Sequence, residues 1–559
     1  MTTANEYSEK PWQKFYEKDV KENIDFKDIL IPQYLEKSAK NFPDRSALIF
    51  QGYSISFKEL NEKVAKFTAV LKDFGIKKGD SVSILLPNVI PCVIAYFAIL
   101  RVGGIVVMNN PLYTDVELEH QFNDSDSKLL ITLDLLANRM VKLREKTKIK
   151  NIIYTSIGEY LPFIKGLLFP LVAKKKGLAA DVDSAKDLYK FKDIIEKYSP
   201  DYTQTKVSFE DIAMYQYTGG TTGVSKGVML THRNISYQAQ QLEAWFPAFE
   251  KGTEVMLGAL PFFHVFGMSV SMNFAIFMGW TNVLVPKPQP DPLLESITKF
   301  KVTFAPLVPT MYIGMLDHPD IKKKDLTSIK GCFSGSAPLP LEVINNFQEI
   351  TGSIIVEGFG LTESTPVTHV NPFNGTRKPG SIGLPLSDTE CKIVDLKNSD
   401  ITMKTGESGE LLMRGPQVMK GYLNKPEETK KTLTEDGWLC TGDVAKMDEE
   451  GYFYIVDRIK DMILSGGYNV YPRDIDEVLF SHPKVLEACC IGIPHEKRGE
   501  AVKAYIVLKA GETSNPEEII AFCAERIAKY KLPIEVEFRD ELPKSNVGKI
   551  LRKDLRKEL

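Results

Sequence analysis

The chain has 559 residues, of which 43% are hydrophobic and 26% are charged, and its formal net charge is −3. This composition is typical of a folded globular protein. The length predicts two or more domains, because a single hydrophobic core rarely extends over so many residues. A nearly balanced charge gives no electrostatic basis for binding nucleic acid, so we expect no nucleic-acid partner.

Cysteine and histidine are both sparse, with seven residues of each. The cysteines form no Cys-x-x-Cys pair, and their odd number is typical of a protein in the reducing cytosol. The histidines are scattered, which argues against a dedicated zinc site. The first residues are polar and contain no apolar segment typical of a signal peptide, so we expect a cytoplasmic protein.

Two segments raise the question of membrane contact. Residues 255–280 contain no Asp, Glu, Lys or Arg and are long enough to cross a bilayer. A proline and the turn-like PFFHVFG interrupt them, so we expect a buried strand, a loop and a buried helix in series. Residues 161–177 (LPFIKGLLFPLVAKKKG) mix large apolar side chains with lysines. They are interpreted either as a peripheral anchor at the inner face of the membrane or as a surface helix followed by solvated lysines.

Strand-like apolar runs alternate with helix-length segments from about residue 45 onward. SVSILLP (81–87) predicts a buried strand, residues 89–104 predict an amphipathic helix that ends at two glycines, and GIVVMNN predicts the next strand. This order is a βαβ unit, and it recurs at KLLITLD and between NVLVP (282–286) and TFAPLVP. We therefore expect an α/β fold whose sheets are mostly parallel.

From Gly406 onward the pattern changes to short strands with tight turns. ESGELLMRG, GYFYIVDRIKDMILSGG and KAYIVLK predict strands, whereas PRDIDEVLFSH and PEEIIAFCAERIAKY predict amphipathic helices. We expect a smaller α+β domain that begins near DRIKD (457–461), and we place the boundary between residues 459 and 460.

The segment YTGGTTGVSKGV (217–228) is the clearest candidate for a binding site. Its four glycines let the backbone bend where a Cβ would clash, and its hydroxyls, amides and Lys226 can surround an oxyanion. The segment is not a Walker A sequence, because it lacks the GxxxxGK spacing. A plain surface turn is the alternative, but we expect a loop that holds the phosphates of a nucleotide.

Two further segments follow apolar strands. LPFFHVFG (260–267) surrounds His264 with aromatic residues, although a single histidine is more often packed or solvated than functional. EGFGLTES (357–364) offers Phe359 as a ring to stack on a base and Glu363 as an oxygen ligand for Mg²⁺. The alternative for the second segment is a turn at the end of a strand with an exposed glutamate.

Two more segments lie nearer the C-terminus. WLCTGDVA (438–445) places Asp443 after a glycine, where its carboxylate can accept hydrogen bonds from ribose hydroxyls. PKSNVGKILRK (543–553) places Lys549 in a turn before a basic helix, from which an ammonium group could reach a site built elsewhere. Any single lysine in such a tail would by default be solvated.

Together and in this order, these motifs resemble the adenylate-forming superfamily of acyl-CoA synthetases, firefly luciferases and peptide-synthetase adenylation domains. The resemblance extends over nearly the whole chain. VDRIKDMILSGGYNVYP and FRDELPKSNVGKILRKDLR are most similar to bacterial long-chain fatty acid–CoA ligases. The resemblance implies a large N-terminal adenylate-forming domain (1–459) and a small, mobile α+β C-terminal domain (460–559).

The resemblance also implies an activity. A fatty acid, long-chain by this resemblance, would be activated by ATP to an acyl-adenylate and then transferred to CoA, with release of pyrophosphate and AMP. The alternatives are another acyl- or aryl-CoA ligase and an enzyme that loads a carrier protein. A non-catalytic binding module is disfavoured, because such a protein has no reason to keep Lys549, Glu363 and Asp443. The oligomeric state stays open, with a homodimer among the options.

Roles for individual residues follow from the same resemblance. Nucleotide binding is implied for Thr218, Gly220, Thr222, Lys226, Gly358, Phe359, Gly360, Thr362, Asp443, Arg458 and Lys549. Catalytic roles are implied for Lys549, Glu363, Thr362 and Lys226, with Glu363 as the Mg²⁺ ligand. The acyl site is implied to include His264, Met268 and Gly335. Contact with CoA is implied for Gly466 and Gly467, and the hinge is implied at Lys460.

Two positions depart from the pattern of the family. Phe359 stands where many relatives have tyrosine, so stacking on adenine is retained and a phenol contact is lost. Met268 stands where some long-chain enzymes have a tryptophan that gates the acyl site. The uncharged residues 266–279 can line a site for an aliphatic chain, and they contain no basic residue that would favour a second carboxylate.

Overall fold

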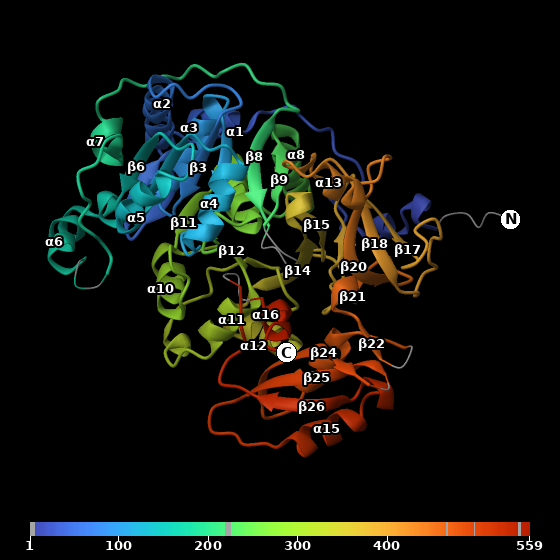
Figure 1. The fold of residues 1–559 in the computed structure, drawn as a ribbon. Helices are drawn as coiled ribbons and strands as arrows, with labels where there is room; N and C mark the ends of the chain where they lie inside the picture. The colour runs from blue at the N-terminus through green and yellow to red at the C-terminus, as the bar shows by residue number, and fades with distance from the viewer. Residues whose placement is uncertain are drawn as a thin grey trace.

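The computed structural model describes residues 6–173, 175, 177–218, 225–465, 468–496, 498–545 and 549–559 (Figure 1). Two large sheets and a small antiparallel sheet form the part of the chain that precedes residue 459, and a further sheet follows it. The helices are α1 (Ile31–Asn41), α2 (Phe57–Asp73), α3 (Ile90–Arg101), α4 (Asp115–Asp124), α5 (Asp134–Arg144), α6 (Phe163–Ala173), α7 (Phe191–Ile195), α8 (His232–Trp245), α9 (Phe274–Met278), α10 (Pro290–Phe300), α11 (Pro309–Leu316), α12 (Leu341–Thr351), α13 (Pro426–Thr432), α14 (Pro472–Phe480), α15 (Pro516–Ala524) and α16 (Arg552–Arg556).

The first large sheet has eight strands and is parallel at its centre. Its order is β19 (Gly421–Tyr422), β9 (Gly227–Thr231), β8 (Ile212–Tyr217), β4 (Ile105–Met108), β3 (Ser81–Leu85), β5 (Leu129–Leu133), β6 (Asn151–Thr155) and β7 (Leu188–Lys190). β3 pairs in parallel with β4 and β5, which confirms the predicted βαβ unit. Among the described strands of this sheet, the antiparallel pairs are β8 with β9 and β9 with β19.

The prediction of an amphipathic helix within residues 89–104 was wrong. Every residue of α3 is buried, because the helix packs against α1 and α2 as well as against β3 and β4. A helix covered on all sides has no polar face, which agrees with its nearly continuous run of apolar residues.

The second large sheet has nine strands and contains much of the core. Its order is β16 (Leu384–Pro385), β15 (Val367–Val370), β14 (Ile354–Gly360), β13 (Gly331–Ser334), β12 (Phe304–Leu307), β10 (Val255–Gly258), β11 (Thr281–Leu284), β1 (Ser46–Phe50) and β2 (Tyr53–Ser56). The strands from β1 to β14 in this order are parallel. Buried Trp280 packs on this sheet, with its ring 5.2 Å from that of Phe274 and 5.6 Å from that of Phe304.

The uncharged segment 255–280 folds as predicted. Strand β10 is followed by a loop, a π-helix (Gly267–Asn273) and α9, and both helical pieces lie almost wholly in the core. In the part of the chain that the structure describes, no helix combines the length and the apolar character needed to cross a membrane.

The small antiparallel sheet leads into the C-terminal unit. Its strands are β17 (Glu390–Val394), β18 (Gly409–Arg414), β20 (Leu439–Met447) and β21 (Phe453–Arg458). The C-terminal unit contains β22 (Ile463–Ser465), β23 (Tyr468–Val470), β24 (Val485–His495), β25 (Gly499–Leu508) and β26 (Pro533–Phe538), together with α14, α15 and α16. In Figure 1 this orange-to-red unit lies below the larger part of the chain.

The predicted fold class is confirmed: a large α/β part with mostly parallel sheets precedes a smaller α+β unit with a core of its own. The boundary between residues 459 and 460 stays a prediction. It falls in a 3₁₀ turn (Ile459–Asp461) that joins β21 to β22. A short connection between two separate cores is where relative movement of two units is expected.

Candidate active site

The glycine-rich segment connects two antiparallel strands of the eight-stranded sheet, β8 and β9. The amide of Thr218 donates a hydrogen bond to the carbonyl of Lys226 at 3.0 Å, so the two ends of the loop meet. Gly220 and Thr222 lie outside the described residues. Of the loop residues predicted to bind the phosphates, the structure describes Thr218 and Lys226. Both are half-buried and lie next to the ends of these strands.

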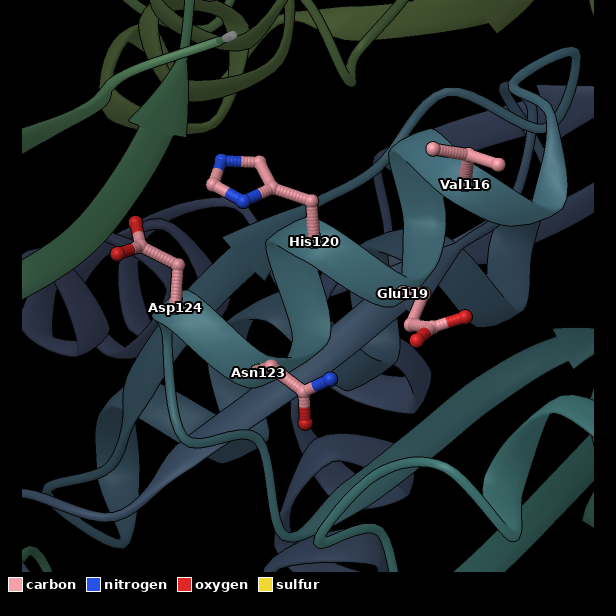
Figure 2. A pocket seen from close by; sticks show the side chains of 5 residues that line it. All are labelled: Val116, Glu119, His120, Asn123 and Asp124. Atoms are coloured by element: carbon pink, nitrogen blue, oxygen red, sulfur yellow. The ribbon is translucent and has the colours of Figure 1, made fainter.

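Helix α4 lies beside the described ends of this loop, a position that the sequence patterns did not predict. Its residues Val116, Glu119, His120, Asn123 and Asp124 lie on one face and line a hollow of about 560 Å³ (Figure 2). His120 Nε2 lies 3.0 Å from the carbonyl oxygen of Ser225, and Asp124 accepts a 2.8 Å hydrogen bond from the Tyr217 hydroxyl. Helix α4 thus supports both ends of the loop. Nothing in the local sequence of the helix indicates this contact.

Glu363 and Lys226 are brought together by a residue that the motifs did not single out. Tyr422 donates a 2.6 Å hydrogen bond to Glu363 Oε1, and the Lys226 ammonium lies 4.3 Å from the centre of the Tyr422 ring. Strand β19 positions Tyr422 by pairing with β9, directly opposite Val228. Burial, followed by the charge of Glu363, raises the pKa of Tyr422, so its hydroxyl stays protonated and remains a donor.

The residues around Glu363 fit a hard cation. Only one of its carboxylate oxygens accepts a hydrogen bond from the residues that the structure describes. The other is left for an oxygen-seeking ligand such as Mg²⁺, which prefers carboxylates and usually keeps several of its waters. Lys226 also lies 3.5 Å from the Glu428 carboxylate, on the exposed side of the same cluster.

The motif residues 358–360 continue strand β14. A Cβ at Gly360 would lie 1.9 Å from the carbonyl oxygen of Pro366, and one at Gly358 would lie 2.3 Å from the Phe333 ring. Both glycines are therefore required by packing. Their predicted contact with a nucleotide stays a prediction. Phe359 is half-buried between them, and its ring lies 6.1 Å from that of His369.

Asp443 and Arg458 lie directly opposite each other on β20 and β21. Asp443 Oδ1 is 3.3 Å from Arg458 Nε, and the side chain of Asp443 is only 4% exposed. Its other oxygen, Oδ2, is buried and has no hydrogen-bond partner among the described residues. Buried polar atoms are nearly always hydrogen-bonded, so this oxygen is suited to accept a hydrogen bond from a ligand hydroxyl, such as one on a ribose.

Lys549 lies close to this pair, although it comes from the last segment of the chain. Burial, reinforced by the positive charge of Arg458, lowers the pKa of Lys549 to about 7, and Asp443 opposes that shift. Lys460 is part of the same group of charges: burial and then Arg458 lower its pKa to about 8. The Lys549 backbone is held by Ser545, whose hydroxyl accepts a 3.1 Å hydrogen bond from the Lys549 amide.

His264 links the site to the predicted acyl-binding residues. Burial, followed by the charge of Lys549, lowers the pKa of His264 to about 4, which places Lys549 near His264 as well as near Asp443. Four residues on, the amide of Met268, the second residue of the π-helix, donates to the His264 carbonyl at 2.9 Å. Such segments are frequent at functional sites.

Met268 and Gly335 occupy packed positions around this segment. The sulfur of Met268 is 2.9 Å from Asn273 Nδ2 and 3.7 Å from the Tyr96 hydroxyl, so Met268 belongs to the core. A Cβ at Gly335 would lie 3.0 Å from the ring of Phe266, two residues after His264. The roles of Met268 and Gly335 in acyl binding stay predictions. Gly466 and Gly467 lie outside the described residues.

A family of known proteins matches most of the chain. The AMP-binding enzyme family matches residues 35–423, and the AMP-binding enzyme C-terminal domain matches residues 474–549. The chain belongs to the AMP-binding enzyme family.

Individual relatives agree with this membership. A long-chain-fatty-acid–CoA ligase of Bacillus subtilis is 45% identical over 99% of this chain and 98% of its own length. A probable 4-coumarate–CoA ligase of Dictyostelium discoideum is 33% identical over 94% of each chain. The ATP-bound structure of MatB from Rhodopseudomonas palustris is 28% identical, with a TM-score of 0.83 over 95% of this chain and 99% of that one. The resemblance predicted from the motifs is confirmed.

The contact between Tyr422 and Glu363 gives a first prediction for this AMP-binding enzyme. Tyr422→Phe keeps the ring beneath Lys226 and removes the donor to Glu363. Since hydrogen bonds to charged groups contribute about 1.5–3 kcal/mol, we expect kcat/KM for ATP to fall by about tenfold or more. Steady-state kinetics at several Mg²⁺ concentrations measure this change.

Tyr198→Phe is the matched control for that experiment. It removes an equally short 2.6 Å hydrogen bond, from the Tyr198 hydroxyl to Asp73, on an exposed surface. We expect it to leave the kinetics unchanged. If both variants behaved like the unaltered protein, Tyr422 would have no part in positioning Glu363.

The lowered pKa of Lys549 gives a second prediction. The ammonium is protonated below pH 7 and deprotonated above it, so kcat/KM for acid-dependent pyrophosphate exchange should fall as the pH rises through about 7. Arginine stays charged throughout this range, so Lys549→Arg should lose that fall even though its overall rate is lower. If kcat/KM of the Lys549→Arg protein still fell with rising pH at the same value, the titrating group would be another one, such as Lys460.

Proposed function

We propose that this AMP-binding enzyme is an AMP-forming long-chain fatty acid–CoA ligase that uses ATP, Mg²⁺ and CoA. The single observation that best supports the proposal is the position of Lys549. From the end of the chain it lies near Asp443, Arg458 and His264, where a nucleotide and an acyl group would meet. The identity of 45% with a long-chain-fatty-acid–CoA ligase supports the same class of substrate.

In the first half-reaction, the carboxylate of the fatty acid attacks the α-phosphorus of ATP and pyrophosphate leaves. Both reactants are anions, so the enzyme has to bring them together and neutralise their charge. We assign Lys549 to hold the carboxylate against the α-phosphate, with Thr362 contacting that phosphate. The residues assigned to the leaving pyrophosphate are Thr218, Gly220, Thr222 and Lys226.

Glu363 is the residue proposed to hold Mg²⁺, and Tyr422 orients its carboxylate. When bound, the ion supplies positive charge to the phosphate oxygens. Asp443 and Arg458 are proposed to bind the ribose, and Phe359, flanked by Gly358 and Gly360, is proposed to stack on adenine.

In the second half-reaction, the thiol of CoA attacks the acyl carbonyl of the adenylate and AMP leaves. Lys549 has no role in that step, so we propose that the C-terminal domain (460–559) turns about Lys460 against the N-terminal domain (1–459). This movement would withdraw Lys549 and bring Gly466 and Gly467 to the adenylate. The short turn that contains Lys460 joins two separate cores, which supports a hinge at this place.

The acyl chain is proposed to bind near His264, Met268 and Gly335, beside the uncharged residues 266–279. We further propose that the enzyme is cytoplasmic and makes peripheral contact with the inner face of the membrane, where long-chain acids collect. A homodimer stays a prediction, and light scattering would test it.

A panel of acids tests the proposed function. Fatty acids from C6 to C20, benzoate and coumarate are each supplied with ATP, Mg²⁺ and CoA, and the acyl-CoA and AMP are quantified. We expect equal amounts of the two products and the highest kcat/KM for long-chain acids. An optimum on an aromatic acid would overturn the substrate class, whereas transfer to a carrier protein in preference to CoA would overturn the acceptor.

A further inference from the structure

Helix α6 turns large apolar side chains toward solvent. Phe163 is 86% exposed, Ile164 72%, Leu167 69% and Leu168 53%. Their spacing places all four on one side of the helix, and we call this set the outward face of α6. A surface helix normally directs its apolar residues inward and its polar residues outward, so an apolar outward face is a departure from the usual pattern.

The opposite side of α6 is packed against the protein. The ring of Phe169 lies so close to Gly158 that a Cβ there would be 2.4 Å from it, and Ala173 is fully buried. The helix is therefore docked through its inner side. Its outward face is exposed because the docked orientation of the helix directs it away from the protein.

Three lysines lie on the helix or near its two ends. Lys165 lies on the helix and donates to the carbonyl of Gln51 at 3.1 Å, and Lys175 is exposed just after the helix. A Cβ at Gly52 would lie 3.6 Å from the Lys299 ammonium and 3.6 Å from Pro162, the residue before the helix, so Lys299 lies near the start of α6. The helix itself contains no Asp or Glu. Exposed apolar side chains with lysines on the same helix and at its ends match the two layers of an anionic lipid surface, its acyl chains and its phosphates.

We propose that the outward face of α6 inserts into the interface of an anionic lipid bilayer, with Lys165, Lys175 and Lys299 against the lipid phosphates. Figure 1 shows α6 at the edge of the large part of the molecule, away from the C-terminal unit. Docking through α6 therefore leaves the C-terminal unit free. This inference deepens the proposed function, since the surface would hold the enzyme where its water-insoluble substrate collects, but its test requires no catalysis.

Tryptophan fluorescence can locate the contact. The four natural tryptophans are buried: Trp12, Trp245, Trp280 and Trp438. A tryptophan introduced by Leu167→Trp should therefore be the one most strongly quenched by lipids with brominated acyl chains, in full-length protein mixed with phosphatidylglycerol vesicles. Ile401→Trp, at a position that is 53% exposed where Leu167 is 69% exposed, is the control and should show no added quenching.

Co-sedimentation with the same vesicles gives the quantitative test. Phe163→Ser with Leu167→Ser should lower the partition coefficient by about tenfold or more, because two large apolar side chains no longer leave water. Lys165→Gln with Lys175→Gln should weaken binding to phosphatidylglycerol and leave the weak binding to phosphatidylcholine unchanged. Ile401→Ser with Leu486→Ser, two exposed apolar residues elsewhere, should bind as the unaltered protein does.

Several outcomes would overturn the proposal. Absence of quenching at position 167 in vesicle-bound protein would place the contact elsewhere, and unaltered sedimentation of the serine variant would do the same. Loss of a dimer in that variant, with vesicle binding intact, would show that a second copy of the chain covers the face.

The membrane inference and the proposed function can fail separately. Failure of the acid panel with vesicle binding intact would contradict the proposed function and leave the inference standing.

Discussion

The carboxylate of Asp443 is buried where the two parts of the chain meet, and one of its oxygens has no hydrogen-bond partner among the described residues. Burying a carboxylate is costly unless nearby cations compensate for the lost hydration. Arg458 supplies one such charge from the neighbouring strand, and Lys549 supplies another from the C-terminal unit. The site is therefore completed by a residue that is far away in the sequence.

The same burial that places Lys549 in the site also limits how firmly it is held there. Its pKa, lowered to about 7, means that the charged ammonium is less stable in the site than in water, so a return of the charged side chain to solvent is electrostatically favourable. Lys549 is nevertheless tied to the C-terminal unit itself. Arg552, three residues on, donates to Asp476 and to the Cys490 carbonyl, and Arg556 donates to Asp461 at 2.8 Å. A rotation of that unit would carry Lys549 with it.

Local patterns in the sequence predicted the βαβ units, the buried segment 255–280, and the candidates Glu363, Asp443 and Lys549. They could not predict Tyr422, because its contact with Glu363 depends on the pairing of β19 with β9, strands far apart in the sequence. The support that α4 gives to the glycine-rich loop is hidden for the same reason. The prediction that α3 is amphipathic failed because its burial on every side depends on tertiary packing, which a local sequence pattern does not show.

The central claim is that Lys549 serves the adenylate-forming step and leaves before CoA attacks. The rates of the two half-reactions, measured separately in the Lys549→Ala protein, test this claim most directly. They are acid-dependent exchange of pyrophosphate into ATP and CoA attack on supplied acyl-adenylate. The account predicts a loss of about 100-fold or more in the first, because one electrostatic contact to the reacting groups is removed, and little change in the second. Lys557→Ala, a surface lysine on the same tail, is the control. Equal losses in both half-reactions of Lys549→Ala would contradict the account.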